Sequence, residues 1–293
     1  MKQHHKGDVV VVTGAGTGVA RACARAFARS GARVHVVDGH LDRVEAVREE
    51  CRVLGAEATS HILDVGDARV MEELAADIVL REGRVDVLLN GPGSIVAGPI
   101  EAISLADWGR AIDTNLWTTI HGIHAFIGRM IVQAPREREG DRASRRGAVI
   151  NIASMLGFAG LPYSAPHAAA SAAIIGLGEA LAAELDPRGI QVLTVCPPAV
   201  KRRFFDDDRV TLPPSWEARL DNFYRAWAIS PDPVARQILR ALRRDDGSLV
   251  VARFGPAALW LAKRIAGRRY ASWTRRIFAF ATDGTHDDGQ PKR

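Results

Sequence analysis

The sequence predicts an α/β fold, in which a doubly wound, Rossmann-type parallel sheet carries helices on both faces. Short β-branched runs alternate with helix-length segments along most of the chain, and this βαβα order is typical of parallel sheets. Runs such as VVVVT and VHVVD are apolar at successive positions, as strands covered on both sides require. With 293 residues, of which 47% are hydrophobic, the chain can bury one large core. We expect a single domain over residues 1–250 and a C-terminal extension over residues 251–293.

Each predicted strand is a short apolar run, and most are followed by a segment of helical length. The expected strands are residues 9–13, 34–38, 59–64, 85–90, 147–153, 191–196 and 249–251. The expected helices are one that ends at residue 30 and those at residues 42–54, 67–82, 105–131, 166–185 and 233–244. The fifth of these helices should begin near Pro166, because proline favours the first turn of a helix.

Composition and charge narrow the class of protein. The formal net charge is +5, and the basic residues concentrate in the C-terminal extension, where no acidic residue occurs between Gly247 and Thr282. Aromatic residues are interleaved there, which suits packing on the fold, a homo-oligomer contact, or peripheral contact with an anionic membrane surface. The charged residues between 133 and 146 are mixed in sign without interleaved aromatics, so they favour a solvated surface loop over a nucleic-acid patch.

Three widely separated cysteines argue against a disulfide framework or a metal site. No stretch approaches the roughly 18 consecutive apolar residues of a membrane-spanning helix, and the first eight residues are polar. We therefore expect a cytoplasmic protein without a bound metal.

A glycine-rich turn after the first strand is the first candidate binding site. It contains Gly14, Gly16, Thr17, Gly18 and Val19. Glycines allow the backbone to turn tightly and to approach a pyrophosphate, which then sits at the N-terminus of the following helix. A glycine-rich turn alone is weak evidence for a nucleotide-binding site, but a predicted strand before it and a predicted helix after it strengthen the inference.

Asp38, at the end of the second strand, lies at the spacing of a carboxylate that accepts hydrogen bonds from an adenosine ribose. A carboxylate repels a 2′-phosphate, and neither Thr17 nor Gly39 supplies an arginine to neutralise one. The sequence thus predicts NAD(H) in preference to NADP(H). The simpler alternative is that Asp38 is a turn residue at the end of a strand.

Further motifs follow in a fixed order along the chain: Asp64-Val65, Asn90-Gly91-Pro92-Gly93, Asn115 in DTNL, and Ser154 in NIAS. With the glycine-rich turn they make residues 8–200 resemble the classical short-chain dehydrogenase/reductase family. Ala20 replaces the last glycine of the family's TGxxxGxG pattern. The resemblance implies that Asp64 and Val65 contact the adenine ring and that Asn115 holds a water. It also implies that Asn90, Gly91 and Gly93 border the cofactor, and that Ser154 hydrogen-bonds the substrate oxygen.

The family's proton-transferring Tyr-x-x-x-Lys pair is replaced in this sequence. Counting thirteen residues from Ser154 reaches His167, and four more reach Ser171 at the lysine position beside the cofactor. Tyr163 is the nearest tyrosine, but Pro166 places it in the loop before the helix. A histidine can itself donate or accept a proton near neutral pH. Either His167 retains that role, with or without Tyr163, or the site has decayed and the histidine is merely tolerated.

A third departure follows the strand at 191–196, where Pro197-Pro198 replaces the family's Pro-Gly and Arg202 replaces a threonine that holds the carboxamide. Pro197 keeps the position that borders the cofactor. The resemblance implies an NAD(H)-dependent oxidoreductase that interconverts a carbonyl and an alcohol on a small apolar substrate, as a homo-oligomer. The alternative is a redox-inactive relative that binds a ligand, assembles with a partner, or performs non-redox acid–base chemistry.

Overall fold

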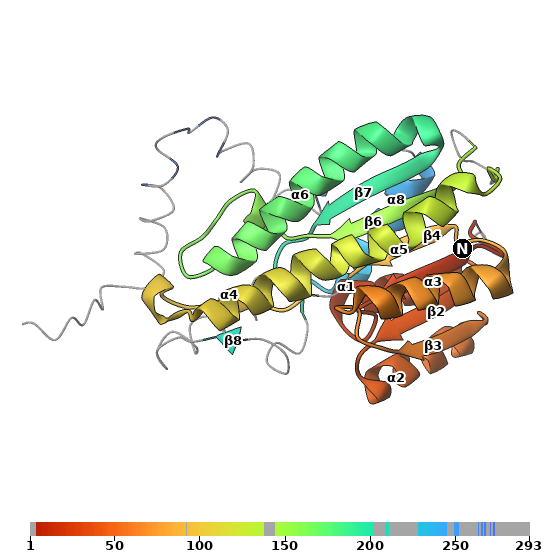
Figure 1. Cartoon of the computed structure of the whole chain (residues 1–293), viewed down its shortest axis with the longest axis horizontal. Helices are drawn as coiled ribbons and strands as arrows, with labels where there is room; N and C mark the ends of the chain where they lie inside the picture. The colour runs from red at the N-terminus through yellow and green to blue at the C-terminus, as the bar shows by residue number, and fades with distance from the viewer. Residues whose placement is uncertain are drawn as a thin grey trace, which may run out of the picture.

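The computed structural model describes residues 4–91, 93–137, 144–201, 209–210, 228–244 and 249–251, together with residues 263, 265, 267, 270 and 272. Seven strands form one sheet in the order β3-β2-β1-β4-β6-β7-β9, and every neighbouring pair is parallel (Figure 1). The strands are β1 (Val9–Thr13), β2 (Arg33–Asp38), β3 (Ala58–Ile62), β4 (Val87–Asn90), β6 (Gly147–Ile152), β7 (Ile190–Cys196) and β9 (Leu249–Val251). The predicted doubly wound fold is confirmed.

Helices cover both faces of the sheet (Figure 1). The first face carries α1 (Gly18–Arg29), α2 (Leu41–Val53) and α8 (Pro231–Arg244), which share one buried cluster with Val10 and Val12 of β1. The second carries α3 (Ala68–Glu82), α5 (Thr118–Val132) and α6 (Ala165–Leu185), whose cluster includes Val9 and Val11. Successive residues of β1 therefore point into different cores, which explains why VVVVT is apolar throughout.

The segment predicted as one long helix at 105–131 consists of three parts. α4 (Leu105–Ile112) passes through a five-residue π-helical turn, η2 (Asp113–Trp117), into α5. Short 3₁₀ helices lie at η1 (Ile100–Ala102), η3 (Met155–Gly157) and η4 (Asp186–Arg188). Two short strands that the sequence did not indicate, β5 (Val96–Ala97) and β8 (Arg209–Val210), pair in parallel outside the main sheet.

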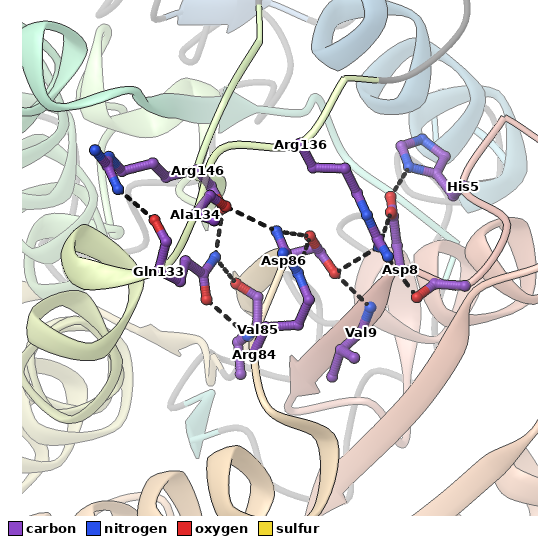
Figure 2. Close-up of polar contacts among 11 residues, drawn as sticks. His5, Asp8, Val9, Arg84, Val85, Asp86, Gln133, Ala134, Arg136 and Arg146 are labelled. Atoms are coloured by element: carbon purple, nitrogen blue, oxygen red, sulfur yellow. Dashed lines mark hydrogen bonds and ion pairs between the residues drawn. The ribbon is translucent and has the colours of Figure 1, made fainter.

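A charged network ties together the amino ends of β1 and β4 (Figure 2). Asp8 and Asp86 precede these strands and are 1% and 0% exposed. The guanidinium of Arg136 lies 3.0 Å from Asp8 Oδ1 and 3.2 Å from Asp86 Oδ2, while His5 Nδ1 lies 2.9 Å from Asp8 Oδ2. Asp86 also pairs with Arg84 at 2.8 Å and accepts a bond from the backbone of β1. Buried carboxylates are costly unless they are paired in this way, so the network is structural.

The loop that follows α5 is not simply solvated at its ends. The Gln133 amide donates to Val85 O at 2.8 Å and accepts from Val85 N at 3.1 Å, as a strand neighbour would. Arg136 and Arg145 form a backbone bridge, and Arg146 N donates to Gly189 O at 2.7 Å. The charged residues at both ends of this loop therefore make bonds that hold the loop to the fold. The mixed positive and negative charges in the sequence did not predict these bonds.

Cys23, Cys51 and Cys196 are free and buried, as expected of small core residues. Burial raises the pKa of Cys51 and Cys196 to about 12 and also raises the pKa of Cys23, so all three remain thiols at neutral pH. Within the described part of the chain, one helical stretch, Ala165–Arg188, is long and apolar enough to cross a membrane by length and composition. In this fold it contains α6, which lies on the sheet.

Candidate active site

The turn between β1 and α1 lies at the carboxyl edge of the sheet, where the order of the strands reverses. β1 pairs with β2 on one side and with β4 on the other, and ligands of doubly wound sheets bind outside this point. Gly14 and Gly18 have φ values of 62° and 57°, a region that favours glycine. The side chain of Thr17 makes no cap bond at the start of α1, and the first turn holds no acidic residue. The first N–H groups of α1 and its positive dipole end therefore suit an anion such as a pyrophosphate.

Asp38 ends β2 and lies directly against this turn. Its Oδ2 accepts a bond from Gly16 N at 2.9 Å, and its Oδ1 accepts a bond from His40 N at 3.1 Å. A Cβ placed on Gly16 would lie 2.7 Å from Asp38 Oδ2, so the close approach requires glycine at this position. Asp38 Oδ2 has a second acceptor direction that a ribose hydroxyl can use.

His40 and Arg43, at the start of α2, border the same carboxylate. His40 Nδ1 lies 3.2 Å from Asp38 Oδ1, and a Cβ on Gly16 would lie 2.8 Å from Arg43 Cβ. Sequence reasoning overlooked both residues because their contact with the turn depends on how α2 packs. Groups that can carry positive charge offset the repulsion between Asp38 and a 2′-phosphate. The preference for NAD(H) over NADP(H) accordingly stays a prediction.

Gly91 follows β4 and contacts the turn from the other side. A Cβ on Gly91 would lie 2.6 Å from Ala20 Cβ and 3.0 Å from Thr13 O. The alanine at position 20 thus faces a glycine at position 91, which leaves room for the methyl group of Ala20.

Beside Gly91, the buried ends of β4 and β6 are joined by their side chains, since Asn90 Nδ2 donates to Asn151 Oδ1 at 2.9 Å. Both asparagines are fully buried, so this bond fixes the spacing of the two strand ends.

Asn115 lies in the π-helical turn and is 5% exposed. Its Nδ2 donates to Ala111 O at 2.8 Å and to Ser94 O at 3.1 Å. Its own carbonyl oxygen accepts a bond from the Thr119 hydroxyl at 2.9 Å. A Cβ on Gly93 would lie 3.0 Å from Asn115 Oδ1, so this side chain borders the segment that follows β4. π-helical turns occur frequently at functional sites.

Ser154 lies just beyond β6 in an extended conformation and caps η3, its Oγ accepting a bond from Leu156 N at 3.2 Å. The hydroxyl proton remains available for donation. Met155 N donates to Pro197 O at 3.1 Å, which places Pro197 beside the serine turn. The resemblance to the dehydrogenase family implies that Ser154 binds the substrate oxygen and that Pro197 borders the cofactor.

The serine turn packs closely on α6. A Cβ on Gly157 would lie 2.8 Å from the carbonyl carbon of Ser171 and 2.9 Å from Ala172 N. Ser171 is 2% exposed, and His167 precedes it by four residues, which places both on one helical face. The structure therefore brings Ser171, at the position of the family's lysine, close to the turn that begins at Ser154, and His167 lies one helical turn before it on α6.

Tyr163 lies in the loop before α6, because the helix begins at Ala165 with Pro166 in its first turn, as predicted. Its φ of 64° is a left-handed conformation that costs a non-glycine residue on the order of 1–3 kcal/mol. Tyr163 O accepts a bond from Gly98 N at 2.8 Å, which helps to hold this conformation. Strain of this kind concentrates at functional sites, so Tyr163 remains a candidate.

Asp64 and Val65 follow β3, on the far side of β2 from the turn, and Asp64 Oδ1 accepts a bond from Gly66 N at 2.8 Å. Pro92 and Arg202 lie outside the described residues, as does most of the C-terminal extension for which a membrane or oligomer contact was predicted. In the part that the structure describes, no group of three or more His, Cys, Asp or Glu side chains could hold a metal ion.

A doubly wound sheet with a glycine-rich turn at the reversal of its strand order defines the Rossmann-type class of proteins. Within that class the chain belongs to the short-chain dehydrogenase family, whose model matches residues 8–211.

Named relatives include the probable oxidoreductase EphD of Mycobacterium tuberculosis, 28% identical over 246 residues that make up 81% of this chain. The chain spans only 40% of the length of that relative. D-threitol dehydrogenase of Mycolicibacterium smegmatis is 32% identical over 66% of this chain and 70% of its own. The structure of a short-chain dehydrogenase/reductase from Burkholderia phymatum in complex with NAD has a TM-score of 0.78 at 21% identity, covering 90% of this chain and 95% of that one, and supports the fold.

Proposed function

We propose that this protein is an NAD(H)-dependent oxidoreductase that interconverts a carbonyl and an alcohol on a small apolar molecule. The observation that carries the proposal is the position of Asp38, whose carboxylate is bonded to Gly16 N in the glycine-rich turn at 2.9 Å. A strand-end turn residue needs only its local bond to His40 N, whereas the bond to Gly16 spans 22 residues and presents the carboxylate at the carboxyl edge.

The residues at this edge fit a dinucleotide. Gly14 and Gly18 hold the turn that would take the pyrophosphate, and Asp38 would accept bonds from the adenosine ribose. Asp64 and Val65 would lie by the adenine, and Asn90, Gly91, Gly93, Ser171 and Pro197 would border the rest of the nucleotide. When bound, the nicotinamide would supply or accept a hydride.

Ser154 and His167 are proposed to act on the substrate oxygen. The Ser154 hydroxyl oxygen accepts a bond from the backbone N–H of Leu156, and its own proton is available for donation. It can therefore donate a hydrogen bond to the substrate oxygen and orient the substrate. His167, one helical turn before Ser171, would donate a proton to the oxygen during reduction and take it back during oxidation. Asn115 would hold a water near this site, and Tyr163 would be the second candidate for the proton.

The first test is calorimetric titration with NADH and NADPH. We expect saturable binding of NADH and weaker binding of NADPH, and we expect Asp38→Arg to reverse or abolish that preference. Glu49→Arg on the exposed side of α2 is the control, because it makes the same change in charge and breaks only an exposed pair with Arg52. If neither nucleotide binds the wild-type protein, the proposal is wrong.

A second candidate function is favoured by the replacement of the tyrosine and lysine positions by His167 and Ser171. In this case the protein would be a redox-inactive relative that uses the same edge for binding, for partner assembly, or for acid–base chemistry. His167→Ala separates the two: an oxidoreductase that relies on His167 loses about 100-fold or more in turnover, whereas a binder retains its affinity. The pair His167→Tyr with Ser171→Lys should raise ketone reduction, and no gain would indicate that the site has diverged elsewhere as well.

We also propose a homo-oligomer. Leu105 of α4, Trp117 of η2 and Val132 of α5 are 88%, 48% and 80% exposed along one continuous helical segment. These side chains are 12 and 15 residues apart, so they lie several turns from one another, and each offers apolar surface that a second chain could bury. Sedimentation equilibrium of the wild-type protein and of Trp117→Glu tests this: the variant should shift toward the monomer.

A further inference from the structure

Two described residues of the C-terminal extension, Lys263 and Tyr270, contact the serine turn, although the family model ends at residue 211. Lys263 Nζ donates to Phe158 O at 2.5 Å. The same ammonium lies 5.9 Å from the centroid of the Tyr270 ring, within the range of a cation–π contact. Lys263 and Tyr270 are seven residues apart in the sequence, on either side of Gly267, whose φ is 48°.

Tyr270 is part of a small apolar cluster with Phe158, Ala159, Ile175 and Cys196. Burial raises the pKa of its phenol, so the ring is neutral at physiological pH and attracts the lysine through its face. Ala153, which also packs against this cluster, directly precedes Ser154. The extension therefore contacts the serine turn through both an apolar and a charged contact.

Phe158 and Ser154 belong to one hydrogen-bonded turn. Gly157 N donates to Ser154 O at 3.0 Å, and Phe158 N donates to Met155 O at 3.1 Å. Ser154 Oγ in turn accepts the bond from Leu156 N. The residue whose carbonyl binds Lys263 therefore belongs to the same short hydrogen-bonded turn as the serine hydroxyl.

We propose that Lys263 is a positioning residue for Ser154, acting through the carbonyl of Phe158 while the Tyr270 ring holds its ammonium in place. Lys263 and Tyr270 are then parts of the active site that the family pattern does not contain. A hydrogen bond from a charged donor is about twice as strong as a neutral one, so its loss releases the turn measurably. The catalytic consequence rests on the proposed oxidoreductase function, whereas the ordering of the turn does not.

The test compares Lys263→Met, which keeps the length of the side chain but removes its charge, with Lys263→Arg, which keeps a charged donor. Hydrogen exchange of the amides of residues 154–159 should be about tenfold faster in Lys263→Met and close to wild type in Lys263→Arg. Exchange in β1 and α1 should not change, and NADH affinity by calorimetry should stay within about twofold. Lys6→Met is the matched control, since Lys6 is exposed in a turn near the N-terminus.

Turnover supplies the second readout, with benzil as an apolar diketone and NADH as reductant. We expect the kcat of Lys263→Met to fall about tenfold and that of Lys263→Arg to be restored. Unchanged exchange at 154–159 in Lys263→Met would overturn the proposal. If wild-type protein binds no NADH or fails to reduce benzil, the proposed function is in doubt, and the exchange experiment alone decides the positioning role.

Discussion

The contact between Ala20 and Gly91 makes a quantitative prediction about the cofactor edge. Gly91→Ala would place a methyl group 2.6 Å from Ala20 Cβ and 3.0 Å from both Leu89 Cδ2 and Thr13 O. Carbon atoms in a packed core approach to about 3.5–4.0 Å, so the new methyl is about one ångström too close. Overpacking of this kind costs typically 1–3 kcal/mol, and we expect about 2 kcal/mol for Gly91→Ala.

Ala20→Gly removes the principal obstacle. Alone it should cost about 1 kcal/mol, the difference in helix propensity between alanine and glycine. If the contact between the two methyl groups causes most of the strain, the double variant should be more stable than the sum of the single variants by about 1 kcal/mol. The residual strain reflects the contacts with Leu89 and Thr13, which Ala20→Gly does not relieve.

Urea denaturation of the four proteins measures this coupling free energy. Ala26→Gly is the control partner for Gly91→Ala, because it is a buried alanine on the same helix about 9 Å farther along the axis. That pair should be additive within about 0.5 kcal/mol. Additivity for Ala20 and Gly91 as well would refute the argument that Gly91 leaves room for the methyl group of Ala20.

Three further outcomes are expected. Arg136→Gln should destabilise the protein by about 3 kcal/mol, because it leaves two buried carboxylates with fewer partners. The control, Arg81→Gln, breaks an exposed ion pair and should cost under about 0.5 kcal/mol. Thermal melting of the two variants and the wild-type protein measures both losses of stability. Burial, followed by the charge of His35, lowers the pKa of His61 to about 4 from the ordinary 6.5, so the unfolded chain takes up a proton first as the pH falls. The free energy of unfolding should therefore be at its full value above pH about 6.5 and should fall as the pH is lowered toward about 4. In His61→Gln this fall should be smaller by about 1–2 kcal/mol, as measured by urea titrations at several pH values. Gly157→Ala should reduce turnover more than nucleotide affinity, since its methyl group would collide with the backbone of α6 at Ser171; equal losses in both would contradict this.

The positions of the strands along the chain and the place of the glycine-rich turn could be predicted because local signals agree there. Apolar runs, glycines and the proline at position 166 each act within a few residues, and β1, Gly14 and the start of α6 lie where these signals place them. The contacts of His40, Arg43 and Arg136 could not be predicted in this way. Those of Arg43 and Arg136 depend on packing between segments far apart in the sequence, such as the 128 residues between Asp8 and Arg136, whereas His40 bonds Asp38 only two residues away through the local geometry of the turn after β2.

The same distinction applies within the candidate site. Ser154, Ser171 and Pro197 could be placed together because their spacing resembles a known family, and the structure joins them through Gly157 and the carbonyl of Pro197. Lys263 offered no such signal, since a lysine in a basic stretch usually indicates a solvated face or a docking surface. Its bond to Phe158 becomes visible only in three dimensions.

The amino and carboxyl edges of the sheet differ in how their polar groups are bonded. This difference explains how the nucleotide-binding residues could be kept while the family's tyrosine and lysine were replaced. At the amino edge, the buried carboxylates of Asp8 and Asp86 pair with arginines and a histidine of the protein itself. At the carboxyl edge, the Asp38 carboxylate, the Ser154 hydroxyl and the first turn of α1 each keep bonding capacity beyond what the fold uses. His167 and Ser171, which replace the family's tyrosine and lysine, are not among these three groups. The binding residues can persist while the proton-transferring residues vary, and nucleotide binding and turnover must be measured separately for this reason.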